Sequence, residues 1–302
     1  MSDDRTLQQQ QQPEVPIIII ERDDEPQKGP ATQPERKKPW LRRLAIAAGI
    51  AGAVVVLLVG YHLYRHAYGI GIAVSCTPAQ NIEKLKAPVR KEKAAVVKTS
   101  DSILGVAIDF YALHGVKANL EFEEPRLDDA SVYLYTRSAD HAANGQYLGS
   151  LVVNGKVRQN DCSRLGYMGM ADGRTVIGIS RSEEVKDYVI ERGGSFFRQF
   201  IMVSNGVIPS RFLIHGKSER RAIGLMNNTL YYIVTRDKET MWDFADALRE
   251  YGFVDAIYIT GGFDYSYYRT ADGTRHDIGN VRNYPFKKWK GTVAWLVFRK
   301  QQ

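Results

Sequence analysis

The feature that most constrains this chain is a run of 21 residues, 44–64, without an acidic residue, lysine or arginine. As an α-helix rising about 1.5 Å per residue, this run would be about 31 Å long, which matches the hydrocarbon thickness of a bilayer. A cleaved signal peptide normally starts close to the N-terminus and has a shorter apolar core, whereas 43 residues precede this run. The sequence therefore predicts one uncleaved transmembrane helix at 44–64, with the lipid bilayer as its partner.

Positive charge is distributed unequally around the predicted span. Only Arg65 follows the span within the next 18 residues. The basic residues that come just before it are Arg36, Lys37, Lys38, Arg42 and Arg43. Because cytoplasmic flanks carry the excess of Lys and Arg, we expect a cytoplasmic N-terminus. The C-terminal domain is then extracytoplasmic, and periplasmic if the protein is bacterial.

Residues 1–43 have the composition of a disordered cytoplasmic tail. They hold eight acidic and eight basic residues, a run of five glutamines and six prolines. Their one apolar cluster, Ile17–Ile20, is too short to offset the entropy of ordering the segment. This cluster is interpreted as a local β-prone patch, with a short partner-binding motif as the alternative.

Residues 65–98 are predicted as a stalk or linker. The part from Asn81 to Lys98 carries six basic and two acidic residues, which suits a solvated stalk or a short surface helix. Cys76 and Cys162, the chain's two cysteines, are compatible with one disulfide in an oxidising compartment or with two free thiols. No set of histidines and cysteines has the spacing of a metal site, and we expect no metal and no cofactor.

The folded domain is predicted to cover residues 99–302. Apolar and aromatic runs there indicate strands, and Asn-Gly, Asn-Asn and Asp-Gly pairs between them indicate hairpins. The predicted strands are 102–113, 131–137, 148–153, 156 onward, 175–179, 196–203, 221–226, 229–235, 255–259 and 292–298. Strands joined by hairpins and mixed with helices favour a mixed sheet over an all-parallel one.

Two helices are predicted within this domain. Ser180-x-x-Glu183 has the form of a capping box, and the helix after it should close at Gly193-Gly194. Thr240-x-x-Asp243 should open the second helix, with apolar residues at helical spacing and Gly252 placed to end it. The predicted fold class is therefore α+β, with a mixed β-sheet, two principal helices and one preceding transmembrane helix.

The order of elements from 221 onward resembles the phosphodiester glycosidase family. It begins with Arg221-Ala222-Ile223-Gly224, followed by a hairpin, the helix 240–251 and the strand 255–259 that runs into Thr260-Gly261-Gly262. An upstream counterpart of another family strand is 107–111, and the resemblance covers roughly 102–298. This chain departs from the family pattern at Thr260, where the family has Asp, and at Asp109, where it has Asn.

The resemblance implies a pocket that cleaves the bond between a sugar and a phosphodiester. Arg221 stands at the family's arginine position and is the candidate phosphate ligand, since a guanidinium offers a planar fork of donors. Asp109 and Asp264 are the candidate carboxylates, which would stabilise an oxocarbenium-like centre or activate water. Thr260, Gly261 and Gly262 are candidate substrate-binding residues, because backbone N–H groups of a glycine loop can hold oxyanions.

Each of these residues also has an ordinary structural interpretation. Arg221 could be a surface arginine at a strand end, Asp109 a satisfied polar residue in a strand, and Asp264 a turn cap. The glycine pair could simply make a tight turn. Three tyrosines offer either stacking faces for sugars or one side of a half-buried hairpin; they are Tyr265, Tyr267 and Tyr268.

Three classes of function follow from the sequence. The first is a membrane-anchored glycosidase that acts on a sugar 1-phosphodiester or another linkage of an exported glycan. The second is a degenerate relative that binds a carbohydrate or sugar phosphate without cleaving it. The third, a basic module for anionic lipid or nucleic acid, is disfavoured: the net charge of +7 comes with no nucleic-acid motif, and we expect no nucleic-acid partner.

Overall fold

The computed structural model describes residues 39–67, 78–89, 91–141, 145–209, 212, 216–259, 265–279 and 293–301. Its first element is helix α1, Pro39–Ala67. Between Pro39 and Tyr64 this helix is long and apolar enough to cross a membrane, and its side chains are not buried in the protein. The predicted span 44–64 is thus helical and apolar throughout. The chain divides into two compact units within this helix, Met1–Val54 and Val55–Gln302.

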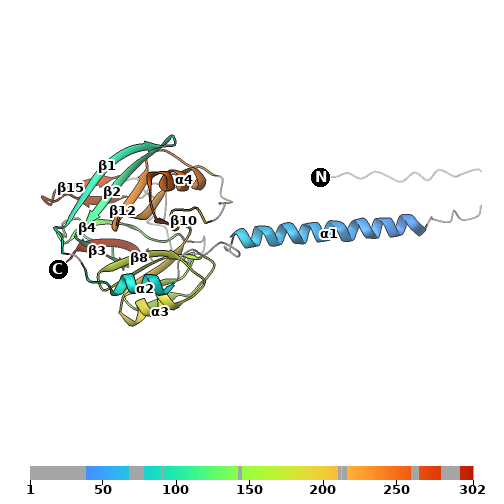
Figure 1. Ribbon diagram of the computed structural model, residues 1–302, viewed down its shortest axis with the longest axis horizontal. Helices are drawn as coiled ribbons and strands as arrows, with labels where there is room; N and C mark the ends of the chain where they lie inside the picture. The colour runs from blue at the N-terminus through green and yellow to red at the C-terminus, as the bar shows by residue number, and fades with distance from the viewer. Residues whose placement is uncertain are drawn as a thin grey trace, which may run out of the picture. The chain divides into compact units, whose positions relative to one another are not determined.

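The domain that follows contains three β-sheets among the described residues (Figure 1). The first sheet has the order β1 (Ala95–Ile103), β2 (Val106–His114), β12 (Thr229–Thr235), β11 (Arg221–Met226), β13 (Asp255–Ile259), β10 (Ile201–Val203). The second has the order β15 (Arg275–Ile278), β14 (Ser266–Arg269), β4 (Val132–Arg137), β16 (Trp295–Lys300), β3 (Val116–Glu121). The third has the order β6 (Lys156–Gln159), β5 (Leu151–Val153), β9 (Ser195–Gln199), β7 (Gly166–Ala171), β8 (Arg174–Ile179).

The predicted combination of helices with a sheet-rich domain is confirmed, but the sheets differ from the prediction in one respect. Every strand pair in the described part of the chain is antiparallel, so parallel and antiparallel pairs are not mixed there. Hairpins explain five of these pairs, since a short turn can join only antiparallel neighbours. Asn154-Gly155 and Asn227-Asn228 make such turns with positive φ at both residues, as predicted.

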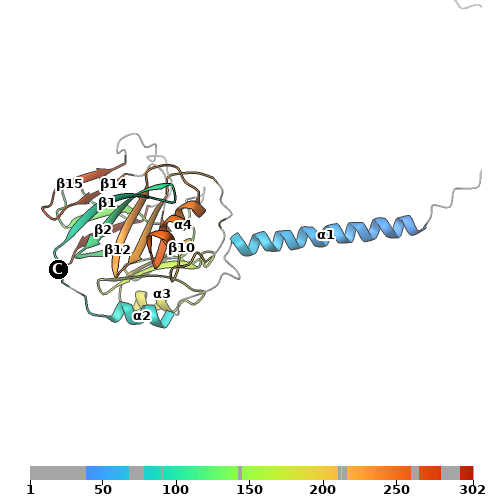
Figure 2. The ribbon, with the colours of Figure 1, turned by 45° about the horizontal axis from the view of Figure 1, so that its top comes forward.

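The inner faces of the three sheets meet in one central core. Its members include Leu113 of the first sheet, Leu296 of the second and Phe197 of the third. The outer face of the first sheet is covered by α4, Met241–Tyr251, and that of the third sheet by α2, Pro78–Lys86, and α3, Glu184–Glu191 (Figures 1 and 2). The described domain therefore has three helices, where the sequence predicted two principal ones.

Helix α4 has the boundaries that the sequence predicts. Thr240 is the N-cap, and its hydroxyl accepts a hydrogen bond from the Asp243 backbone N–H at 3.0 Å. Gly252 follows the last turn with φ of 107°, a left-handed conformation that favours glycine. The buried side of the helix places Met241, Phe244 and Leu248 against the first sheet. Local capping and apolar spacing agree at this element.

Helix α2 shows that part of the predicted stalk belongs to the domain. Leu85 has no exposed surface and packs with Val185 and Val189 of α3. Asn81 is also buried, and its amide donates to the Tyr167 hydroxyl at 2.7 Å. The short-helix alternative for this segment therefore fits the structure, whereas a solvated stalk does not. Only two of the nine residues of α2 are buried, and one of them is Asn81, so the sequence shows no apolar pattern that would predict a packed helix here.

The predicted capping box before α3 is wrong. The N-cap is Glu183, and its side chain makes no capping hydrogen bond. Instead, its carboxylate pairs with Arg198 of β9 and with Lys186. Ser182 takes over part of the capping role, because its hydroxyl accepts from the Glu184 backbone N–H at 3.2 Å.

Two predicted strands are each divided in two. The run 102–113 turns at Leu104-Gly105, both with positive φ, so that β1 and β2 form a hairpin. The run 196–203 separates at Phe200 into β9 of the third sheet and β10 of the first. Strands β3 and β7 were not predicted. Apolar continuity alone could not reveal these breaks, because both halves of each run are equally strand-like.

Candidate active site

Asp109 and Arg221, the two predicted catalytic residues that the structure describes, lie in one cross-strand row of the first sheet. Asp109 pairs with Val234 of β12, and Val234 pairs with Arg221. Arg221 in turn pairs with Ile259, the last residue of β13. Because neighbouring strands lie about 4.8 Å apart, the Cα atoms of Asp109 and Arg221 are about 10 Å apart.

Both side chains belong to the inner face of the sheet. Residues two apart on a strand share a face. Tyr111, two residues after Asp109, and Ile223, two residues after Arg221, are both members of the central core. The row therefore places a carboxylate and a guanidinium on the same face, at the end of the sheet where β13 runs into Thr260.

Asp109 is held by two donors from β1 and by a third that follows β12. Its Oδ1 accepts a hydrogen bond from the Ser100 hydroxyl at 2.7 Å, and its Oδ2 lies 2.7 Å from Lys98 Nζ. Arg236, just beyond β12, places its Nε 3.7 Å from Oδ1. The Asp109 side chain is 13% exposed. It is thus an oriented carboxylate at the margin of the core, where a ligand can still reach it.

Arg221 is surrounded by hydroxyl groups between the first and second sheets. The residue is 1% exposed. Its Nη1 donates to Ser266 Oγ of β14 at 3.5 Å, and that hydroxyl lies 3.2 Å from the Tyr232 hydroxyl. Thr136 of β4 donates to the same tyrosine at 3.5 Å. Since a buried guanidinium is unfavourable without polar partners, the Ser266 hydroxyl is one of the groups that accommodate Arg221 inside the domain.

A group of tyrosines lies next to the row, and two of them, Tyr111 and Tyr232, are two residues further along the strands on the same face of the sheet. Tyr111 contacts Tyr232 and Tyr268, with ring centroids 5.6 and 5.1 Å apart. Burial raises the pKa of Tyr111, and the Asp109 carboxylate raises it further. The phenol therefore stays protonated and donates to Asp109 Oδ2 at 3.5 Å. This contact adds a neutral donor to the groups that orient the carboxylate.

The other four predicted site residues lie outside the described residues. They are Thr260, Gly261, Gly262 and Asp264. Their roles stay predictions. The register of β13 nevertheless fixes where the loop starts, because Ile259 is the neighbour of Arg221 in the row.

The three tyrosines after the glycine loop form a half-buried hairpin, the second interpretation that the sequence allowed. Tyr267 has no exposed surface and packs on Tyr135, with centroids 4.9 Å apart. Tyr268 is 9% exposed and is covered by His276 at 5.0 Å. Tyr265 donates its hydroxyl to Asp277 at 2.9 Å.

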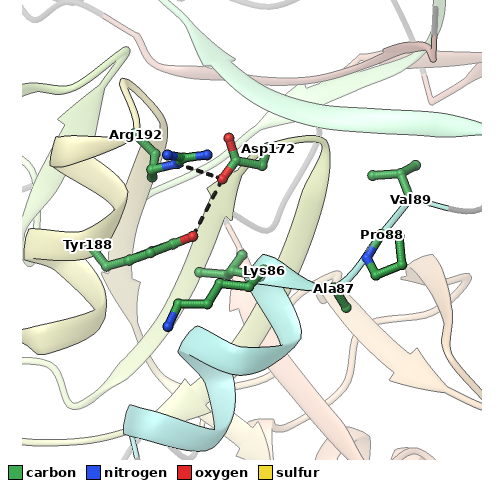
Figure 3. Close-up of a pocket in the computed structure, with 8 residues that line it drawn as sticks. Lys86, Ala87, Pro88, Val89, Asp172, Tyr188 and Arg192 are labelled. Carbon is green, nitrogen blue, oxygen red and sulfur yellow. Dashed lines mark hydrogen bonds and ion pairs between the residues drawn. The ribbon is translucent and has the colours of Figure 1, made fainter.

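A separate pocket of about 470 Å³ lies between the end of α2 and α3 (Figure 3). Asp172 accepts from Arg192 at 2.8 Å and from the Tyr188 hydroxyl at 3.5 Å on one side of it. Lys86, Ala87 and Pro88 line the other side (Figure 3). The pocket contains no predicted site residue, and its charges are already paired. It is therefore not assigned to the reaction.

Other groups do not suggest a metal or thiol site. Within the described ranges, no group of three or more His, Cys, Asp or Glu side chains is placed to hold a metal ion. Cys162 is exposed, and Cys76 lies outside the described residues. The question of a disulfide stays as open as it was from the sequence.

The sequence did not single out the residues around Asp109. Lys98 was predicted to lie in the stalk, and neither Ser100 nor Arg236 belongs to a sequence motif that indicated a site. One signal was available. In a hairpin that turns at Leu104-Gly105, Ser100 falls opposite Asp109, and Lys98, two residues earlier, falls on the same face opposite Tyr111. Recognising that turn would have placed both residues beside the carboxylate.

Residues 135–298, more than half of the chain, match the family described as phosphodiester glycosidase. The chain belongs to the phosphodiester glycosidase family. The match includes Arg221 and residues 260–264, and it begins after Asp109, so the family assignment rests on the C-terminal part of the predicted resemblance.

Two solved structures are similar to the chain. The zebrafish N-acetylglucosamine-1-phosphodiester alpha-N-acetylglucosaminidase catalytic domain, auto-inhibited by its pro-peptide, has a TM-score of 0.48 and 13% identity, over 69% of this chain and 83% of that one. A hypothetical protein from Synechocystis has a TM-score of 0.50 and 10% identity, over 68% of this chain and 62% of that one. The latter likeness shows the fold alone. No curated protein sequence matches the chain.

Proposed function

We propose that this protein is a membrane-anchored glycosidase that hydrolyses a sugar 1-phosphodiester or a related linkage of an exported glycan. Membership of the phosphodiester glycosidase family supports this function. The observation that carries it is the row that holds Asp109 and Arg221 on one face, about 10 Å apart at their Cα atoms. Such a row places a carboxylate and a positive charge at the same end of the sheet, where they can act on one sugar phosphodiester.

In the proposed reaction, the bond between the anomeric carbon and the phosphate oxygen breaks. The oxygen of one water molecule bonds to the anomeric carbon, and the two products are a free sugar and a phosphate monoester that gains the water's proton. Asp109 or Asp264 stabilises the oxocarbenium-like centre or accepts that proton in passing. Arg221 offsets the charge of the leaving phosphate, and backbone N–H groups of 260–262 hold its oxygens.

The proposed anchor is α1, with the N-terminus cytoplasmic and the domain extracytoplasmic. Its support is the apolar stretch Pro39–Tyr64 together with the excess of basic residues before it. An anchored enzyme of this orientation would meet glycans that are exported across the same membrane.

The test is turnover by the full chain, purified with its helix in detergent. The substrates are 1-(methyl phosphates) of glucose, galactose, mannose and N-acetylglucosamine, and released reducing sugar is measured. We expect Arg221→Ala and Asp109→Asn each to lower kcat by about 10²-fold or more. Arg126→Ala is the matched control, because Arg126 is exposed and pairs only with the exposed Asp128 among the described contacts. Full activity of the Arg221→Ala protein would contradict the proposed role of Arg221 in the reaction.

A second function is a module that binds a sugar phosphate without cleaving it. Two observations favour it: Arg221 is 1% exposed, and Asp109 is already engaged by Lys98 and Arg236. This alternative predicts saturable binding of the same four compounds and no release of sugar from any of them.

A further inference from the structure

We propose that Lys98 and Arg236 bind the phosphate of the substrate and, in doing so, release Asp109 for the reaction. This inference deepens the proposed function and rests on it. It assigns phosphate recognition, at the end of the first sheet where β13 finishes, to two residues outside the sequence pattern that resembles the family.

Exposure separates these two cations from Arg221. The side chains of Lys98 and Arg236 are 38% and 49% exposed, whereas Arg221 is 1% exposed. An incoming anion can therefore contact Lys98 and Arg236 directly. Arg221 acts on the same site from inside the domain, through its positive charge.

The local charge also favours an anion. Lys98 and Arg236 flank a single carboxylate, Asp109, at 2.7 and 3.7 Å, which leaves one net positive charge on the group. A phosphodiester carries one negative charge, so it completes the neutralisation. Lys98 is held over the ring of Tyr111 at 5.7 Å, which keeps its ammonium at the site when Asp109 is displaced.

Asp109 keeps its position when Lys98 and Arg236 pair with the phosphate instead. The hydroxyls of Ser100 and Tyr111 remain as donors to its two oxygens, at 2.7 and 3.5 Å. A carboxylate that is no longer paired with cations interacts more strongly with a developing positive centre. Binding of the charged substrate would thus activate the group that stabilises the oxocarbenium-like centre or accepts the proton of the water.

The test measures binding of a probe that cannot be cleaved. The probe is an N-acetylglucosamine analogue in which CH₂ replaces the oxygen between C1 and a methyl phosphonate, so it carries one negative charge. Its neutral dimethyl ester is the control ligand. Both are titrated calorimetrically into the full chain in detergent, at two salt concentrations.

We expect Lys98→Met and Arg236→Met each to weaken binding of the charged probe by about tenfold, with no change for the neutral ester. Asp109→Asn should tighten binding of the charged probe several-fold, because it removes the competing carboxylate. Lys117→Met, which removes an exposed lysine of β3 in the second sheet, is the matched control and should bind like the unaltered chain.

Three results would overturn the inference: no binding of the charged probe, equal binding of the charged and neutral probes, or unchanged or weaker binding in Asp109→Asn. The proposed function is tested separately by turnover. If the chain binds the charged probe in the expected pattern but releases no sugar, the phosphate site stands and the glycosidase activity does not.

Discussion

At the scale of single residues, Arg198 shows how this fold uses a buried arginine for structure. It is 1% exposed and donates to the backbone carbonyls of Ser180 and Ser182 at 2.8 and 3.0 Å. Its charge is paired with Glu183 at 2.7 Å. These bonds tie β9 to the loop before α3. Arg221, a second fully buried arginine, donates to the Ser266 hydroxyl at 3.5 Å.

Replacing Glu183 tests this structural role. Glu183→Gln should lower the free energy of unfolding, because it leaves the buried Arg198 without its counter-charge. We expect a loss of only about 2 kcal/mol, because Glu183 itself is partly exposed and solvent screens the pair. Glu191→Gln, at an exposed glutamate of the same helix, should change stability little. Chemical denaturation of both variants measures the difference, and equal stabilities would contradict this role.

The same pair predicts a dependence on pH. Burial raises the pKa of Glu183, but hydrogen bonds and charge from Lys186 and Arg198 outweigh it, and the net pKa is lowered. A lowered pKa means that the folded chain holds this proton less tightly than the unfolded chain. The stabilisation is therefore present above the usual glutamate pKa and is lost as the pH falls through the lower, folded-state value. Glu183→Gln should flatten this part of the acid unfolding curve.

At this scale, the sequence predicted candidate catalytic residues but not the side chains that contact them. Asp109 and Arg221 were identified from the family-like pattern, and the structure places them in one row. Lys98 and Ser100 could not be found without the position of the turn at Leu104, and Arg236 could not be found without the pairing of β12 with β2. A contact between strands depends on register, and register is set by turns that an apolar pattern does not locate.

At the scale of elements, α4 and α3 show when capping patterns succeed. At α4, Thr240 and Asp243 bond to each other, and no other charged group competes for them among the described contacts. At α3, the glutamate of the Ser180 pattern is drawn away by Arg198, which lies 15 residues later in the chain. A local motif is therefore reliable only where tertiary partners do not claim its side chains.

The cap of α4 can be tested directly. Thr240→Ala should lower the free energy of unfolding by about 1 kcal/mol, because the Asp243 backbone N–H loses its acceptor. Thr99→Ala is the control, since Thr99 is an exposed residue in the middle of β1. Thermal unfolding of the two variants measures the effect. A Thr240→Ala protein as stable as the control would show that the cap is not needed.

At the scale of the whole molecule, the domain begins earlier than the sequence predicts. Helix α2 follows the predicted transmembrane segment and closes the outer face of the third sheet, and β1 starts at Ala95 rather than at 99. The sequence predicted the class of fold and most hairpins of the domain. It did not predict three separate sheets, because sheet membership depends on contacts between distant strands such as β13 and β10.

Leu85 is the residue that tests the role of α2. Leu85→Ala should lower the free energy of unfolding by about 3 kcal/mol, through lost burial and the cavity left beneath the helix. Ala79→Ser, at an exposed position of the same helix, should have little effect. Chemical denaturation compares the two. A change in the free energy of unfolding near zero for Leu85→Ala would mean that α2 is not packed on the domain and belongs to the stalk.

The central claim is that the domain cleaves the bond between a sugar and a phosphodiester, and the position of the broken bond tests it most directly. The measurement is turnover of a sugar 1-(methyl phosphate) by the full chain in water enriched in ¹⁸O, with both products analysed by mass spectrometry. Cleavage between carbon and oxygen predicts that ¹⁸O enters the sugar and not the methyl phosphate. Recovery of ¹⁸O in the phosphate product, or no turnover of any sugar offered, would contradict the claim.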